Sequence, residues 1–151
     1  MAECMTAQIT AQIITKLGAI AGYGALTIEQ ERITPYINGR YPYISLVGPH
    51  TAYETKFNKI TSMEVAFTVK WFSAEEESKD TSPITYQNRN VNRDIIVALK
   101  ADQSLNGLSQ AIDIIEDSYD MEFVANRIAY FNYVSFVVST VIDDKDLTLY
   151  E

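Results

Sequence analysis

Apolar residues recur at helical spacing in two segments of the chain. In residues 5–20 every third or fourth position is apolar, and the polar positions between them carry Thr and Gln rather than Lys and Arg. Residues 86–101 show the same spacing. The pattern predicts two helices, the first capped by Thr6, whose core-facing side chains are Ile9, Ile13, Leu17, Ile20, Val91, Ile95, Ala98 and Leu99.

Five other segments are rich in β-branched and aromatic residues and predict strands, at 41–49, 63–72, 108–115, 121–127 and 130–142. In 63–72 apolar and polar residues alternate, which is typical of a strand with one buried face. We expect the core side of that strand to carry Met63, Val65, Phe67, Val69 and Trp71.

Residues 130–142 carry large apolar side chains on both faces of the predicted strand. Val134, Phe136 and Val138 share one face. The opposite face presents Phe131, Tyr133, Val137 and Val141. Such a strand is covered on both sides, either as a central strand or by a neighbouring subunit.

Polar segments are expected to separate these elements. We predict irregular structure at 26–40, an exposed loop at 50–59 and an acidic turn at 116–120, and we expect Gly48-Pro49 to stop a strand. The turn at 102–107 is expected to end the second helix. The charged segment 73–83 is either a solvated loop or a segment that becomes ordered against a partner.

The order helix, strand, strand, helix, strand, strand, strand indicates an α+β fold. We predict a single domain over residues 1–151, with a mixed or antiparallel sheet of about four to five strands and two helices packed on one face. No repeat or low-complexity tract divides the chain.

Charge and chemistry narrow the functional classes. The net charge is −8 and the basic residues form no run, which argues against a surface that grips nucleic acid. Cys4 and His50 are the only residues of their types, so neither a disulfide nor a His-based triad is expected. The apolar runs are interrupted or short, and no basic leader precedes them, so we expect no membrane partner.

The sequence lacks the common catalytic and cofactor motifs. It contains no GxxxxGK[ST], GxGxxG, HExxH, CxxC or GxSxG. Carboxylates at Asp113, Glu116 and Asp117 could serve acid–base catalysis only if they met in one cleft in contrasting environments. We expect them to be solvated, and we expect no enzyme activity, no cofactor and no metal.

One segment has the character of a family motif. The predicted second helix, Asp94-Ile95-Ile96-Val97-Ala98-Leu99, is followed by Asp102 and then by Leu105-Asn106-Gly107-Leu108 before a strand begins. This arrangement resembles the tail-terminator proteins (tail-completion, minor tail) of long-tailed bacteriophages, which often show a helix that ends in a hydrophobic–Leu–x–x–Asp–x–x–Leu–x–Gly segment and is followed by strands. The first helix is also similar to that of head-completion and adaptor proteins of the same viruses.

The resemblance implies a structural role in the virion neck. It implies a ring, usually a hexamer, at the head-proximal end of the tail tube, which stops tube polymerisation and meets the head-connector or stopper protein. DNA would pass through this ring without sequence-specific binding. The protein would be assembled into the virion in the bacterial host cytoplasm, with no catalysis and no cofactor.

A ring requires head-to-tail contacts between different surfaces of identical subunits. Under this resemblance we expect the assembly surface to include Glu75, Glu76, Glu77, Asp80, Phe131, Tyr133, Val137 and Val141. We expect the lumen to be lined by Glu116 and Asp117, whose charge would repel passing DNA.

Two other classes stay open from the residues alone. One is a small ligand-binding module with a tyrosine-rich pocket formed by Tyr36, Tyr41, Tyr43 and Tyr53, since Tyr is a frequent contact residue. The other is an enzyme built on carboxylates.

Overall fold

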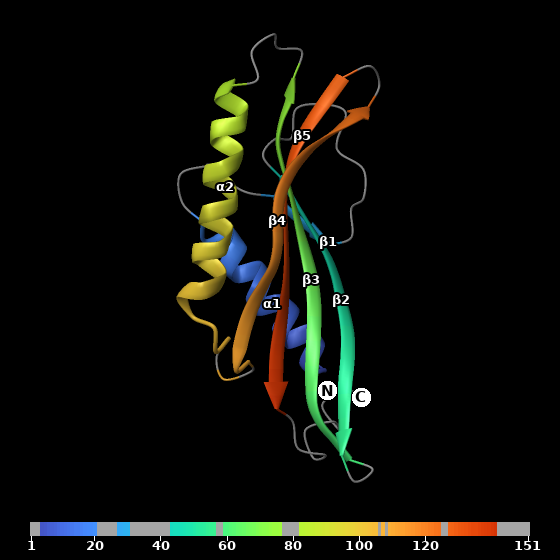
Figure 1. The fold of residues 1–151 in the computed structure, drawn as a ribbon. Coiled ribbons are helices and arrows are strands. Elements are labelled where there is room, and N and C mark those ends of the chain that lie inside the picture. The colour runs from blue at the N-terminus through green and yellow to red at the C-terminus, as the bar shows by residue number, and fades with distance from the viewer. Residues whose placement is uncertain are drawn as a thin grey trace.

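The computed structural model describes residues 4–20, 27–30, 43–56, 59–76, 82–105, 107, 109–124 and 127–141. These residues form two helices and five strands (Figure 1). In chain order the elements are α1 (Met5–Gly18), β1 (Thr27–Gln30), β2 (Tyr43–Lys56), β3 (Lys59–Glu76), α2 (Ser82–Ala101), β4 (Ala111–Val124) and β5 (Arg127–Val141).

The strands form one mixed sheet in the order β1-β2-β3-β5-β4. β1 runs parallel to β2, and every other neighbouring pair is antiparallel. The predicted α+β class is therefore confirmed, with a sheet of five strands. β5 lies inside the sheet, whereas β4 is bonded to β5 alone among the described strands.

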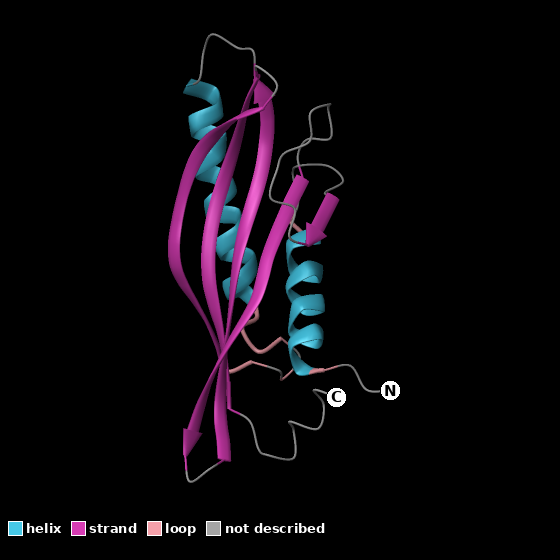
Figure 2. Cartoon of the chain, turned by 90° about the vertical axis from the view of Figure 1, so that its right-hand side faces the viewer, coloured by secondary structure: helices cyan, strands magenta, loops and turns pink. Residues whose placement is uncertain are grey.

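The hydrophobic core joins both helices to the sheet. α2 contacts β4 and β5, and α1 contacts α2 and β1; in Figure 2 α2 runs behind the strands. The rings of Phe67 and Phe136 stack across β3 and β5 with their centroids 5.4 Å apart. The helical and alternating patterns correctly predicted the buried residues Ile9, Ile13, Leu17, Val91, Ile95, Leu99, Met63, Val65, Phe67, Val69, Trp71, Val134, Phe136 and Val138.

The turn between α2 and β4 is fixed by hydrogen bonds. Asp102 Oδ1 accepts from the backbone N–H of Ser104 at 3.1 Å and from its hydroxyl at 2.7 Å. Lys100 Nζ donates to the carbonyl of Ile112 at 2.7 Å, which joins the helix end to the strand. Leu105 is buried in this turn with a positive φ of 49°, and Gly107 follows with a φ of 84°. The predicted turn is thus a specific local structure.

The expected loop at 50–59 and the expected stop at Gly48-Pro49 are both wrong. β2 continues to Lys56 and pairs with β3 down to Lys56↔Lys59, past the last partner that β5 offers at Ser62. Residues 52–56 are exposed on both faces, so this part of the strand has no apolar alternation to reveal it. Pro49 is tolerated because β1 pairs only with residues 43–46 and the β2–β3 register is irregular here.

The expected acidic turn at 116–120 is also wrong. Residues 111–124 form one strand, β4, and the separate strand predicted at 121–127 does not exist. Because β4 lies at the sheet edge and its residues 115–120 are all exposed, polar side chains on both faces cost little there. The amino-acid composition of this edge strand is therefore similar to that of a turn, which explains the wrong prediction.

Smaller differences concern the element ends. β1 at 27–30 falls in a segment expected to be irregular. Residues 73–76 belong to β3 and not to a loop, and α2 begins at Ser82, where Pro83 occupies the first turn and its missing N–H leaves no helical bond unmade. Cys4, not Thr6, is the N-cap residue of α1.

Candidate functional site

A β-bulge sets which side chains of β4 face the helices. The register passes from Ile114↔Phe136 to Glu116↔Ser135, so Ile115 is an extra residue and is 65% exposed. Beyond the bulge Asp117 pairs with Val134, which is buried in the core. Bulges commonly re-aim side chains near functional sites. Here the bulge turns Asp117 toward α2 and leaves Glu116 on the opposite face.

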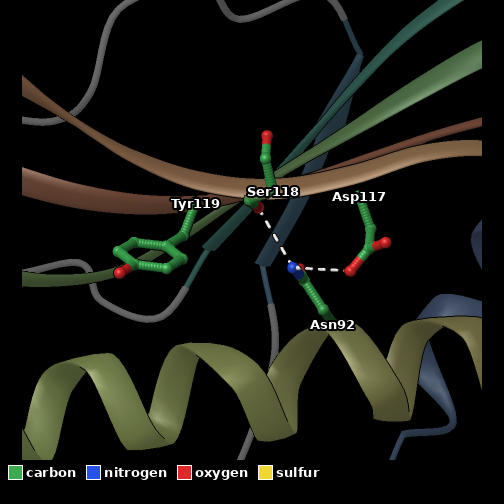
Figure 3. A pocket seen from close by; sticks show the side chains of 4 residues that line it. All are labelled: Asn92, Asp117, Ser118 and Tyr119. Atoms are coloured by element: carbon green, nitrogen blue, oxygen red, sulfur yellow. Dashed lines mark hydrogen bonds between the residues drawn. The ribbon is translucent and has the colours of Figure 1, made fainter.

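A groove lies between α2 and β4 and is lined by Asn92, Asp117, Ser118 and Tyr119, with a volume of about 380 Å³. Figure 3 shows Asn92 reaching from α2 toward β4, with Asp117 and Tyr119 on either side of it and the side chain of Ser118 pointing away. Asn92 Nδ2 donates to Asp117 Oδ2 at 3.4 Å and to the carbonyl of Ser118 at 3.1 Å.

Two buried asparagines connect this groove to the core. Asn132 Nδ2 donates to Asn92 Oδ1 at 3.0 Å; Asn92 is 6% exposed and Asn132 is fully buried. Burying amides is costly unless they form hydrogen bonds, and a chain of such bonds fixes a unique arrangement. The Asn132–Asn92 pair therefore holds β4 and Asp117 at a defined place against α2.

The sequence analysis did not identify these asparagines. One of them could have been recognised from the sequence. Asn132 is a polar residue at a core-facing position, because it alternates with Val134 and Phe136 on one face of β5. An amide at such a position needs a buried polar partner. Neither Ser118 nor Tyr119 carried any signal in the sequence, since their role depends on the bulge.

The opposite face of β5 carries the side chains that were expected to drive assembly. Phe131 is only 6% exposed, and its ring centroid lies 5.4 Å from that of Phe72. Tyr133 and Val137 are half-buried, and Val141 is 60% exposed. The predicted two-faced strand is therefore present, but Phe131 belongs to the packing of the chain itself, and accessibility increases toward Val141.

The structure separates the two groups that were expected to form one assembly surface. Glu75 and Glu76 lie in β3 and pair with the first residues of β5, whereas Val141 is its last. At about 3.3 Å per residue these ends of β5 lie roughly 40 Å apart. Glu77 and Asp80 lie outside the described residues.

The three carboxylates considered for catalysis are also divided. Asp113 and Glu116 pair with Val137 and Ser135 on the face away from the helices, while Asp117 faces α2. The described residues thus offer no cleft that unites them. Nor do they contain a group of three or more His, Cys, Asp or Glu arranged to hold a metal.

Of the tyrosines expected around a pocket, Tyr53 is an exposed residue of β2. Tyr43 begins β2, and Tyr36 and Tyr41 lie outside the described residues. Neither α1 nor α2 has the length and apolarity that a bilayer crossing requires, as far as the described residues extend.

Comparisons with known proteins add no family to this picture, because no family model matches the sequence and no curated protein matches it. The function is therefore inferred from the residues of the chain, their geometry and the resemblance in the segment 94–108.

Proposed function

We propose that this chain is a structural subunit of a tailed bacteriophage, a tail terminator. It forms a ring at the head-proximal end of the tail tube, stops tube polymerisation and joins the tail to the head connector. The family named in this proposal rests on the resemblance of the helix–turn–strand segment at residues 94–108. In that segment Leu105 is buried and Gly107 adopts a positive φ, so the two motif residues have structural roles.

The observation that carries the proposal is the edge of β4. Fourteen residues form this strand, and β5 is its only partner among the described strands. On that strand side chains from α2 and from the turn after it already bond the N–H and C=O of Ile112 and the carbonyl of Ser118. Pairing with another chain would use the backbone groups along the rest of the outer edge. A ring subunit needs two different surfaces that meet head to tail, and the exposed end of β5 at Val141 supplies a second one.

The acidic character of β4 fits a ring through which DNA passes. Asp113, Glu116 and Asp120 are exposed, and by their register with β5 they share the face away from the helices. Fixed negative charge repels the phosphate backbone and prevents adhesion. Glu116 therefore remains in the proposed lumen-facing set. Asp117, which faces α2, is left out of it.

Negative-stain imaging of the purified protein, alone and mixed with tail tubes, tests this function. We expect rings, or a cap of extra density at one end of each tube. Tubes from an unrelated tail are the control and should stay uncapped. Binding to isolated connector complexes but not to tubes would favour a head-completion adaptor. A monomer that binds neither structure would contradict both roles.

A further inference from the structure

We propose that the groove between α2 and β4 is a binding site for a guanidinium group, carried either by an arginine side chain of a partner chain or by a small molecule. This goes beyond the proposed ring function and does not depend on it. The described residues that line the groove are Asn92, Asp117, Ser118 and Tyr119.

The polar groups in the groove call for a ligand that donates hydrogen bonds. The Asp117 carboxylate and the Ser118 carbonyl are both acceptors, and each already receives one hydrogen bond from Asn92. Because a carboxylate has about four lone-pair sites, Asp117 can accept more hydrogen bonds. Among the described residues that line the groove there is no Lys or Arg, so Asp117 supplies their only formal charge and favours a cation over an anion.

The charge and size of the groove further limit the kinds of ligand that would fit it. The described lining offers one carboxylate, which is too few for Ca²⁺ or Mg²⁺, since these ions take six or more oxygen ligands. The volume of about 380 Å³ lies at the small end of the range of ligand pockets, about 300–1,000 Å³. It therefore suits the end of one side chain or a small organic cation.

Tyr119 favours guanidinium over ammonium. Tyr119 is 47% exposed, and its side chain flanks Asn92 on the side opposite Asp117 (Figure 3). A planar guanidinium stacks on an aromatic face and presents five N–H donors in a fixed fork, whereas a lysine ammonium is a strongly hydrated point charge. The groove presents the Tyr119 ring on one side of Asn92 and the Asp117 carboxylate on the other, the two kinds of group that a guanidinium binds.

The groove is held in shape by the core. The bulge at Ile115 turns Asp117 and Tyr119 to the same side, and the buried Asn132–Asn92 pair fixes Asp117 through a hydrogen bond. Acceptors that are fixed before binding lose little conformational freedom on binding. This gives the buried asparagines a role besides packing.

Saturation-transfer difference NMR tests the proposal, because it detects weak ligands on a protein of any assembly state. The probe is N-acetyl-L-arginine amide, which mimics an arginine within a chain. N-acetyl-L-citrulline amide is its uncharged isostere, and N-acetyl-L-lysine amide tests the preference for guanidinium. We expect saturable transfer to the arginine probe, weaker transfer to the lysine probe and none to the citrulline probe.

Variants locate the site. D117N should weaken arginine binding about tenfold, since it removes a charge-assisted hydrogen bond. E116Q makes the same change in charge on the other face of β4 and should leave binding unchanged. Equal transfer to the arginine and citrulline probes, or equal loss in both variants, would overturn the proposal. The citrulline comparison uses the unaltered chain, so it decides even if D117N fails to fold.

Free L-arginine separates the two sources of the ligand. A groove made for a side chain of a partner binds the amide at least as well as the free amino acid. Tighter binding of free L-arginine identifies a small-molecule site. In either case guanidinium recognition stands. Binding of neither compound would overturn the proposal, as would the failed citrulline or variant comparison.

Discussion

Gly48 offers the sharpest test of how β2 is built. It lies in the irregular stretch of β2 between Val47 and His50, it is buried, and its φ is +120°. A Cβ added there would lie 2.7 Å from the carbonyl oxygen of Ala66 and 3.2 Å from Phe67 Cδ1. Both neighbours belong to β3, and the nearer one is backbone, so the strands would have to move apart.

The expected cost of Gly48→Ala has two parts. The positive φ disfavours any L-residue by about 1–2 kcal/mol. Forcing a methyl group into close-packed surroundings adds about 1–3 kcal/mol. The free energy of unfolding should therefore fall by roughly 2–5 kcal/mol, a large share of the 5–15 kcal/mol that is usual for a domain.

Gly107→Ala is the matched control. Its φ of +84° is also positive, but an added Cβ would meet nothing within 4 Å. This variant should incur only the backbone cost of about 1–2 kcal/mol. The difference between the two variants combines the clash with Ala66 and the larger backbone strain at a φ of +120°, which lies farther from the left-handed region at about +57°. Urea unfolding, followed by the fluorescence of the buried Trp71, gives both values if the m-values agree. Equal destabilisation of the two variants would refute the close packing described for Gly48.

Two further predictions concern the core and the turn. Phe136→Ala removes a fully buried ring stacked on Phe67 and should lower the free energy of unfolding by about 3–5 kcal/mol. Val97→Ala at an exposed helix position should change it by less than about 0.5 kcal/mol. A similar loss of stability in both variants would contradict the burial of Phe136 in the core. Hydrogen bonds from the hydroxyl and backbone N–H of Ser104 lower the pKa of Asp102. These bonds therefore stabilise the turn at pH values above the unfolded-state pKa of Asp102, and this stabilisation is lost as the pH falls through the lower, folded-state pKa. Ser104→Ala should raise the pKa of Asp102 toward its ordinary value in a carboxyl ¹³C NMR titration, and an unchanged pKa would show that the hydroxyl has no such effect.

Periodicity predicted the parts of the fold that have one buried face. In β3, Met63 and Val65 alternate with exposed or half-buried positions, and in α1 Ile9 and Ile13 recur on the buried side. The same reasoning failed for the second half of β2 and for residues 116–120 of β4. Both stretches are exposed on each face, and only backbone pairing with a neighbouring strand identifies them as strands.

The groove could not be predicted, because it depends on a one-residue register shift. If β4 paired regularly through Ile115 with no bulge, Glu116 and Ser118 would face α2 in place of Asp117 and Tyr119. A bulge of this kind cannot be predicted from the sequence when it contains no glycine. The in-phase polarity of Asn132 was visible, but its partner lies forty positions away on α2.

Inhibition of tail-tube growth tests the ring proposal most directly. Tail-tube protein is allowed to polymerise with increasing amounts of this protein, and tube lengths are measured by electron microscopy. Val141 on β5 and Val97 on α2 are each 60% exposed, so Val141→Glu and Val97→Glu place the same charge at equally accessible positions. We predict that mean tube length falls with added wild-type protein, that V97E acts like wild type, and that V141E loses the effect. Tube lengths that stay the same at every ratio of wild-type protein would contradict the account.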